Sequence, residues 1–349
     1  MGEVRLRLDA ERWREHLGVV ARATPGLVPV IKGNGYGFGR SRLAEESSRL
    51  GADTVAVGVA KEVGRVRRFF DGEVVIMQPW DAADLTAQAY LSDPRVITTV
   101  SRLADLETIS DSDLEPRVLV EVQTSMRRHG IRLDHLSAVT PLLERVRFEG
   151  WSIHLPLRVE GRYAEAEALT RAAVAVIPGT LWLSHLSPEE ASQLAAGAGS
   201  EPVAVRLRVG TRLWLGDETH RQTVATVLDV HPVRRGDRAG YRGRLVPADG
   251  WIVVVAGGTA HGIGLEAPTS AVTMRQRAVS VATGSLEAAG LALSPYTING
   301  KKRWFLEPPH MQSSQLFLPR KETPPAIGDE VPVELRLTTA TVDSVTWDL

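Results

Sequence analysis

Short apolar runs recur at regular intervals through the first two-thirds of this chain, and segments with helical spacing of apolar residues separate them. Eight such runs fall within roughly 210 residues, at 28–31, 54–59, 73–77, 96–100, 117–122, 147–154, 180–184 and 203–208. The intervening helical segments include 41–50, 60–70 and 82–91. Strand-like runs that alternate with helices indicate parallel βα units. Eight units predict a (β/α)8 barrel of the TIM type, with an open doubly wound sheet as the alternative.

The pattern changes after about residue 216, where helical spacing fades. Short β-rich runs separated by glycine and proline replace it, at 222–230, 244–246, 251–255, 302–306, 315–318 and 331–337. Runs of this kind predict a second, all-β domain of sandwich or barrel type. We therefore expect an N-terminal strand (1–9) that joins the β domain, a barrel (10–217) and a C-terminal β domain (218–349).

Composition removes several classes of function. The chain has 349 residues, a formal net charge of −1 and no cysteine. The absence of cysteine excludes disulfides, thiolate zinc sites and a cysteine nucleophile. A net charge near zero gives no reason to expect binding to nucleic acid or to a membrane. The N-terminal segment MGEVRLRLDAERW is charged and lacks the apolar stretch of a signal peptide. These features predict a cytoplasmic enzyme that acts on a small molecule.

The stretch PVIKGNGYGFGR, residues 29–40, places a lysine between an apolar run and a series of glycines. It does not match the dinucleotide fingerprint G-x-G-x-x-G in either register. It does not match a phosphate-binding P-loop either, because there the lysine follows the glycines. The order found here predicts that Lys32 stands at the end of a buried strand, with the glycine loop around something bound beside it.

Active sites of (β/α)8 barrels lie at the carboxyl ends of the strands, so the residues just after each predicted strand are candidates. They are Lys32, Met77, Arg128, His154, Ser187 and 208–211. A lysine that is partly removed from water has a lowered pKa and can form an imine with a carbonyl compound. A carbonyl cofactor that carries a phosphate would suit this set, because backbone N–H groups of the loops can bind the phosphate.

The lysine segment resembles that of the alanine racemase family, the fold-type III enzymes that use pyridoxal phosphate (PLP). Five further segments resemble motifs of this family and follow in the same order. They are EVQTSMRRHGI (121–131), FEGWSIHLP (148–156), RVGTRLWLGD (208–217), GDRAGYRGRLVPADGWIVVVAGGTAHG (236–262) and PPHMQ (308–312). Together the six segments span nearly the whole chain, and they imply this fold and this cofactor more strongly than any particular substrate.

The resemblance implies that Lys32 binds PLP covalently and also acts as a base. The other residues implied at the cofactor are Tyr36, Gly210 and Thr211 at the phosphate, with Ser187 a looser candidate; His154 against the pyridine ring; Arg208 at the ring nitrogen; and Met77, Glu121 and Arg128 nearby. An arginine keeps its proton, so the ring nitrogen would stay unprotonated. That arrangement favours return of the proton to Cα, and hence racemisation over transamination.

The same resemblance implies a homodimer with shared active sites and an amino-acid substrate. Tyr241 would be the second base, supplied by the partner subunit, so that lysine and tyrosine act on opposite faces of Cα. Met311 would also come from the partner and offer its backbone N–H to the substrate carboxylate. Arg128 would bind that carboxylate as well, and Thr259 would stand at the substrate entrance. Glu121 takes a position where many members carry a carbamylated lysine, and it would orient Arg128.

The sequence departs from the family pattern at the substrate entrance. Thr259 and His261 stand in GTAHG where the family has G-Y-A-D-G, and His310 and Gln312 flank Met311 where it has C-M-D. The closing Y-E motif is absent, since the chain ends ATVDSVTWDL, and HLSPEE replaces H-x-x-N-S. These changes favour a wider or differently charged substrate, or a different outcome of the same cofactor chemistry. We expect both histidines to be polar replacements rather than ligands of a metal ion.

Ordinary structural roles stay open for each residue taken singly. Lys32 could be a solvated rim residue, His154 a core histidine, and Arg127 could take the role given to Arg128. Four functions follow in order of preference. They are a PLP-dependent amino-acid racemase; an enzyme with the same cofactor that performs decarboxylation, aldol cleavage or dehydration; a PLP-binding protein without turnover; and a sugar-phosphate barrel enzyme without PLP.

Overall fold

The computed structural model describes residues 2–157, 160–265 and 292–348. The chain forms two compact units, one made of Arg14–Asp217 and the other of Met1–Trp13 together with Glu218–Leu349. Each unit has its own buried core and is described by itself.

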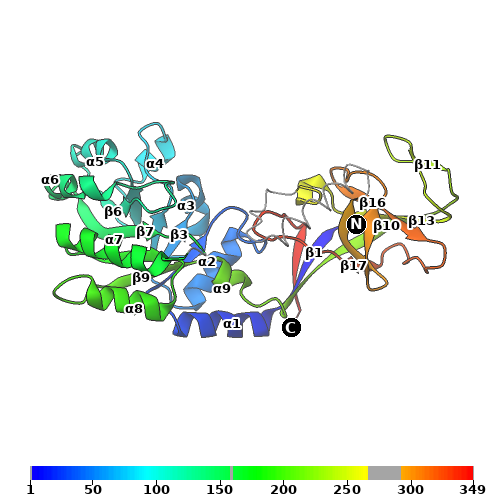
Figure 1. Ribbon diagram of the computed structural model, residues 1–349, viewed down its shortest axis with the longest axis horizontal. Helices are drawn as coiled ribbons and strands as arrows, with labels where there is room; N and C mark the ends of the chain where they lie inside the picture. The colour runs from blue at the N-terminus through cyan, green and yellow to red at the C-terminus, as the bar shows by residue number, and fades with distance from the viewer. Residues whose placement is uncertain (1, 158–159, 266–291, 349) are drawn as a thin grey trace. The chain divides into compact units, whose positions relative to one another are not determined.

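The first unit is a closed barrel of eight strands, each paired in parallel with the next along the chain (Figure 1). The strands are β2 (Leu27–Ile31), β3 (Thr54–Val57), β4 (Glu73–Ile76), β5 (Val96–Val100), β6 (Arg117–Val122), β7 (Arg147–His154), β8 (Leu181–Ser184) and β9 (Val205–Val209). Strand β2 also pairs with β9, which closes the ring. The predicted barrel is therefore confirmed, and the open doubly wound sheet is not formed.

Helices connect successive strands and lie outside them (Figure 1). They are α1 (Ala10–Arg22), α2 (Arg40–Arg49), α3 (Ala60–Val66), α4 (Leu85–Ala89), α5 (Leu103–Ser110), η1 (Leu133–Val139), α6 (Thr140–Leu143), α7 (Arg162–Val176), α8 (Pro188–Gly197) and α9 (Thr211–Leu215). Helix α4 is shorter than predicted because Asp84 caps it, accepting hydrogen bonds from the N–H groups of Thr86 and Ala87. None of the described helices is long and apolar enough to cross a membrane.

Apolar side chains fill the inside of the barrel. A buried cluster draws one or two residues from most of the strands: Val28, Val30, Ala56, Val75, Ile97, Leu119 and Trp182. Met77, which directly follows β4, packs against this cluster. The barrel is thus a packed core rather than a pore, and polar chemistry is confined to its two ends.

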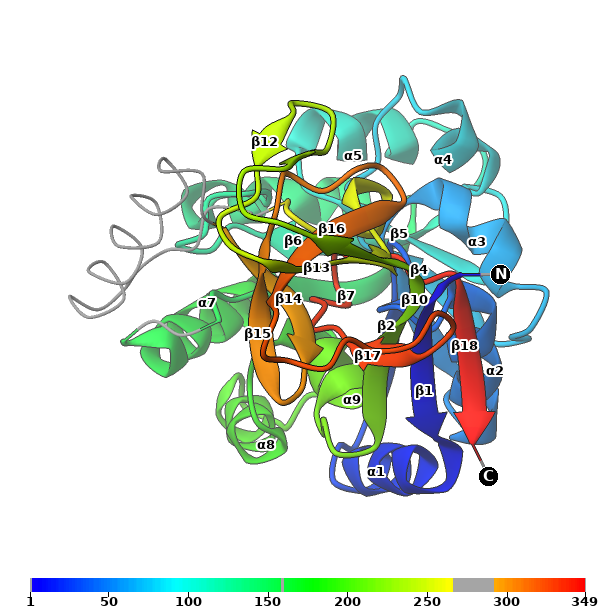
Figure 2. The ribbon, with the colours of Figure 1, turned by 90° about the vertical axis from the view of Figure 1, so that its right-hand side faces the viewer.

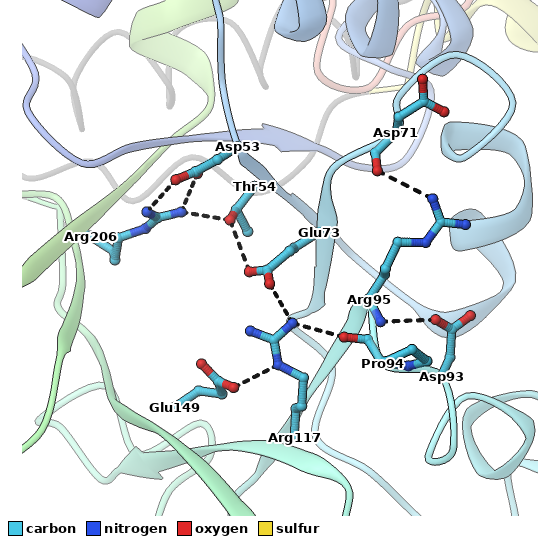
Figure 3. A network of polar contacts seen from close by, with 10 residues as sticks. All are labelled: Asp53, Thr54, Asp71, Glu73, Asp93, Pro94, Arg95, Arg117, Glu149 and Arg206. Carbon is cyan, nitrogen blue, oxygen red and sulfur yellow. Dashed lines mark hydrogen bonds and ion pairs between the residues drawn. The ribbon is translucent and has the colours of Figure 1, made fainter.

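Ion pairs join the strands at their amino-terminal ends (Figure 3). Arg117 of β6 contacts Glu73 of β4 and Glu149 of β7. Arg206 of β9 pairs with Asp53 at the start of β3, and its guanidinium lies 5.2 Å from the centre of the Trp182 ring. Burial by itself would lower the pKa of Arg117, but the carboxylates of Glu149 and Glu73 outweigh it and raise that pKa.

The second unit is an antiparallel sheet, except for one parallel pair. Its strands are β1 (Val4–Asp9), β10 (Arg221–Val233), β13 (Gly250–Ala256), β14 (Leu293–Ile298), β15 (Lys301–Phe305), β16 (Ser313–Pro319), β17 (Glu330–Pro332) and β18 (Ser344–Asp348). Their order is β14-β15-β16-β13-β10-β1-β18, with β17 on β10. Figure 2 shows β1 between β10 and β18; it is antiparallel to the first and parallel to the second. A β domain after the barrel is confirmed.

Some predictions within the second unit were wrong in detail. The run at 331–337 forms a strand only as far as Pro332, and proline has no N–H to continue the ladder. Strands β14 and β18 and the short strand β11 (Arg238–Ala239) were not predicted individually, whereas the hairpin partner of β11, β12 (Arg244–Leu245), lies within the predicted run at 244–246. Strand β11 has two residues, too few for a periodic pattern to reveal.

We expect Arg117→Met to destabilise the barrel by about 2–3 kcal/mol, because it leaves two carboxylates at the barrel end without their cation. Urea unfolding followed by helical circular dichroism would measure the change. Arg145→Met is the control, since the Arg145–Asp111 pair is exposed on both sides and such pairs contribute at most about 1 kcal/mol. Equal stability of the two variants would show that the Arg117 pairs contribute little.

Candidate active site

Lys32 stands directly after β2, at the carboxyl-terminal end of the barrel. The loop that follows turns tightly: Gly33, Gly35 and Gly37 all have positive φ angles, as does Tyr36 at 54°. Glycine adopts this region without a steric penalty. At Gly35 a Cβ atom would lie 2.5 Å from the backbone nitrogen of Arg40. The glycines therefore shape a turn that brings Tyr36 back over the strand ends.

Glu62 on α3 ties this loop to the neighbouring one. Its buried carboxylate accepts hydrogen bonds from the N–H of Gly33 at 2.8 Å and from the N–H of Gly58 at 2.7 Å. Arg40 pairs with the same carboxylate at 3.5 Å. The loops after β2 and β3 are thus held together next to Lys32.

The amine of Lys32 lies in a positively charged environment. The residue is accessible to solvent, yet the pKa of its amine is lowered, first by partial removal from water and then by Arg128 and Arg208. Glu62 acts in the opposite direction. A larger fraction of neutral amine follows, and the neutral amine is the nucleophilic form.

Arg208 of β9 is buried beneath this amine, with 7% of its surface exposed. Its guanidinium donates to Ser152 Oγ at 2.9 Å and to the carbonyl oxygens of Ile153 and Trp182. Its Nε is buried and has no partner among the described residues. Burial lowers the pKa of Arg208 to about 10, Glu121 opposes this shift, and the group stays charged at neutral pH. The structure therefore presents a rigid cation with one unused donor.

His154 ends β7 and is held as a neutral imidazole. Its Nδ1 lies 2.6 Å from Ser184 Oγ, and its ring centre lies 4.9 Å from that of His185. Burial, Arg208 and Arg128 lower the pKa of His154 to about 2. A ring that stays neutral can pack against a flat bound molecule without a desolvated charge.

Glu121 and Arg128 lie near Arg208 with different exposure. Glu121 of β6 is 5% exposed, and its Oε2 has no partner in the described part of the chain. Burial raises the pKa of Glu121, while Arg208 and Arg128 act to lower it. Arg128 belongs to the exposed loop after β6. Glu121 thus interacts with both arginines electrostatically.

The predicted phosphate residues fall into two groups. The Tyr36 hydroxyl comes so close to Gly210 that a Cβ atom there would lie 2.1 Å from it. Gly210 and Thr211 begin α9, next to that hydroxyl. Ser187 stands apart, because it caps α8: its Oγ accepts from the N–H of Glu190 and its own N–H donates to the Glu190 carboxylate. Both polar groups of Ser187 are therefore already used.

Tyr241, Met311 and His310 come together in the second unit. They line a pocket of about 410 Å³ with Glu307 and Arg242. Tyr241 is 86% exposed and Met311 is 72% exposed. Thr259, the predicted entrance residue, donates its N–H to the His310 carbonyl at 2.9 Å. The two segments that depart from the expected pattern are thus bonded to each other.

His261 is committed to internal bonds of the second unit. Its Nδ1 accepts from the N–H of Gly258 at 3.3 Å, which leaves the proton on Nε2 for Asp343, 3.1 Å away. Asp343 also accepts from the N–H of Val4. No group of three or more metal-ligating side chains occurs among the described residues.

Three contributors were missed by sequence reasoning. Glu62 is 29 positions from the Gly33 N–H that it binds, so no short motif connects them. Ser184 is the last residue of β8 and His185 is the first residue of HLSPEE, and both contact His154. The strand-end rule selected Ser187 there; applied one turn earlier, it would have found them.

Comparison with known proteins gives one family. The family model described as alanine racemase, N-terminal domain, matches residues 8–178. An alanine racemase of a Nitratiruptor species is 25% identical over 146 residues, which cover 41% of this chain and 40% of that protein.

Solved structures share the fold over nearly the whole chain. Biosynthetic alanine racemase from Pseudomonas aeruginosa has a TM-score of 0.70 at 17% identity, covering 97% of this chain and 91% of that one. Alanine racemase from Bartonella henselae with covalently bound pyridoxal phosphate has a TM-score of 0.70 at 16% identity, covering 97% and 93%. Alanine racemase from E. faecalis has a TM-score of 0.68 at 18% identity, covering 95% and 88%.

We expect Lys32 to react with acetic anhydride at lower pH than a lysine peptide added to the same reaction. Its lowered pKa gives more neutral amine at each pH. Trace labelling over a pH series, read by mass spectrometry, would give the midpoint for the cofactor-free protein. Glu62→Gln should move that midpoint further down and Arg128→Gln should move it up.

Arg127→Gln is the matched control for Arg128→Gln, because Arg127 is the preceding residue and does not shift the Lys32 amine. A midpoint that responds to Arg127 and not to Arg128 would show that the loop after β6 is placed one residue out of register.

We expect His154 to remain neutral through the acidic range in which a histidine peptide gains its proton, near pH 6.5. Its surroundings disfavour the charged form, so the proton adds only at much lower pH. Nitrogen-15 NMR of the imidazole in cofactor-free protein, assigned with His154→Gln, would follow this directly. Titration together with the peptide would contradict the neutral assignment.

Proposed function

We propose that this chain, which belongs to the alanine racemase family as a divergent member, is a PLP-dependent amino-acid racemase. The observation that carries the proposal is the Lys32 amine with its lowered pKa at the open end of the barrel, beside Arg128 and Arg208. A nucleophilic amine among cations suits a carbonyl compound that bears negative charge.

The residues present fit the cofactor. Arg208 has a buried Nε with no described partner, and this donor would meet the pyridine nitrogen. Gly210 leaves room beside the Tyr36 hydroxyl that a larger residue would fill, so the two would hold the phosphate together with Thr211. Lys32 would hold PLP covalently, and Met77 and His154 would lie against the ring. When bound, PLP withdraws electrons from the substrate and makes its Cα proton acidic.

Two bases would then move that proton. Lys32 would act on one face of Cα, and Tyr241 of the partner subunit on the other. An exposed tyrosine and an exposed methionine on the same pocket support burial of this face in a homodimer. Within such a dimer the backbone N–H of Met311 and the guanidinium of Arg128 would bind the substrate carboxylate.

Glu121 would set the charge around that carboxylate. Its buried side chain acts electrostatically on both Arg128 and Arg208. A glutamate carries this negative charge directly, without a carbamylated lysine. We propose that it keeps Arg128 oriented once the substrate carboxylate is present.

A substrate other than alanine is the second possibility. A different reaction with the same cofactor is the third and is less favoured. The observation behind it is that Thr259 and the segment at His310 are hydrogen bonded to each other. These replacements therefore alter bonded segments of the second unit, at the expected entrance. Such a change would alter which substrate side chain fits the entrance more than it would alter binding of the cofactor.

We expect the protein with PLP in D2O to exchange the Cα proton of at least one amino acid and to form its opposite enantiomer. NMR and chiral chromatography over a panel of L- and D-amino acids would identify the substrate. Lys32→Ala should abolish both processes, and Tyr241→Phe should slow racemisation by about 10²–10⁴-fold.

Lys301→Ala and Tyr90→Phe are the controls, because Lys301 is exposed at the start of β15 in the second unit and Tyr90 follows α4, on the side of the barrel where β5 begins. Exchange that survives in Lys32→Ala would exclude the proposed role of this lysine. No exchange of any amino acid by the PLP-loaded protein would exclude the racemase.

A further inference from the structure

The carboxylate of Glu307 is buried directly behind Tyr241. Glu307 follows β15, and 3% of its surface is exposed. Its Oε1 accepts the backbone N–H of Tyr241 at 3.2 Å. The same oxygen is hydrogen bonded to Nε2 of His310. One buried acceptor is therefore shared between the backbone of the exposed tyrosine and a histidine side chain.

The histidine in turn supports the tyrosine ring. The centres of the His310 and Tyr241 rings are 4.4 Å apart, and the ring planes are tilted by 49°. This separation is at the short limit of favourable aromatic contacts, about 4.5 Å. Because Tyr241 is 86% exposed, the contact with His310 supplies a large part of what restrains its ring within the second unit.

The backbone before Tyr241 is shaped to admit the carboxylate. Gly240 has a φ of 74°, and a Cβ atom there would lie 2.1 Å from the Glu307 carboxyl carbon. Glycine at this position therefore serves two purposes, a left-handed turn and close contact with Glu307. The carboxylate packs against the chain at the point where the tyrosine begins.

The location of Tyr241 explains why such support is needed. The residue lies in the turn between β11 and β12, a hairpin with two paired positions. Short exposed hairpins are mobile, whereas a catalytic base must be held within about 0.5 Å of its working position. A buried carboxylate with two hydrogen bonds fixes both the backbone and the ring of a residue that its own hairpin holds weakly.

We propose that Glu307 is a positioning residue for Tyr241, acting through the Tyr241 N–H and through the ring of His310. The proposal rests on the proposed function only in that the function makes Tyr241 a catalytic base. It assigns His310 to the support of Tyr241 rather than to the substrate entrance or to a metal ion.

Glu307→Gln is the informative variant. Its amide oxygen can take the place of Oε1 toward both partners, but it lacks the negative charge that strengthens these two hydrogen bonds. His310→Ala removes the ring that supports Tyr241, while His310→Phe keeps a ring without the bond to Glu307. Glu334→Gln is the control, since Glu334 pairs with Lys302 on the exposed surface of the same unit.

Isotope exchange separates positioning from loss of structure. Racemisation must slow equally in both directions, because the two enantiomers have the same free energy. Proton exchange that retains the configuration at Cα need not slow equally for the two enantiomers. Lys32 alone can remove the proton and return one from solvent on the same face. We expect Glu307→Gln and His310→Ala to slow racemisation about 10–100-fold while one enantiomer still exchanges at nearly the normal rate.

His310→Phe should lie between His310→Ala and the unchanged protein, and Glu334→Gln should be normal. Equal slowing of exchange for both enantiomers in Glu307→Gln and His310→Ala would overturn the proposal, because lost cofactor or lost fold acts on both. Normal racemisation in these two variants would overturn it as well.

A second measurement does not depend on activity. The chain has five tyrosines, so carbon-13 labelling at Cζ gives five NMR signals, and Tyr241→Phe identifies one of them. That signal should shift or broaden in Glu307→Gln and His310→Ala and stay unchanged in Glu334→Gln. If the unchanged protein exchanges no amino acid, the racemase proposal fails, and this signal alone decides whether Glu307 positions Tyr241; no change in either variant refutes it.

Discussion

Positive charge is concentrated at the carboxyl end of the barrel, where water is partly excluded, and the properties of the site depend on this. Lys32, Arg128 and Arg208 repel one another across this space. Of these three groups, a lysine amine loses its proton far more easily than an arginine. Repulsion and burial therefore favour the neutral form of the Lys32 amine and leave the arginines as fixed cations. Glu121 and Glu62 limit the effect by opposing it.

The two ends of the barrel are arranged in opposite ways. At the amino-terminal end, Arg117 pairs with carboxylates of β4 and β7, and Arg206 pairs with Asp53 just before β3, although the Nε of Arg206 has no partner among the described residues. At the other end, Arg208 Nε and Glu121 Oε2 are buried without partners among the described residues. Each such atom costs about 1–3 kcal/mol. Arginine–carboxylate pairs thus dominate the amino-terminal end, while the carboxyl end keeps buried polar atoms of an arginine and a glutamate without a partner among the described residues.

The fold could be predicted because it depends on local pattern. Each of the eight barrel strands overlaps its apolar run, and the residues at the strand ends follow from the topology. Long-range partners could not be predicted this way. Glu62 acts on a loop 29 positions away, and Glu307 on a residue 66 positions away. Neither has a signal in its own neighbourhood of the sequence.

Ser187 shows the opposite limit of sequence reasoning. A serine just after a strand is a plausible phosphate ligand, but Ser187-Pro-Glu-Glu190 is also a capping box, and the structure shows that the helix uses it. Both readings come from the same four residues. The residues at the ends of β7 and β8 that do contact each other are His154 with Ser184 and His185, and the latter two lie three and two positions before Ser187.

The departures from the family pattern differ in their physical meaning. His261 exchanges hydrogen bonds with Gly258 and Asp343 and so holds the turn at 259–261 to the edge of the sheet. That turn is bonded to the segment of Met311 through two backbone hydrogen bonds. The position of Met311 therefore depends on a histidine that no substrate needs to touch. The replacements at 259–261 and at 310–312 are therefore structurally coupled and do not act one side chain at a time.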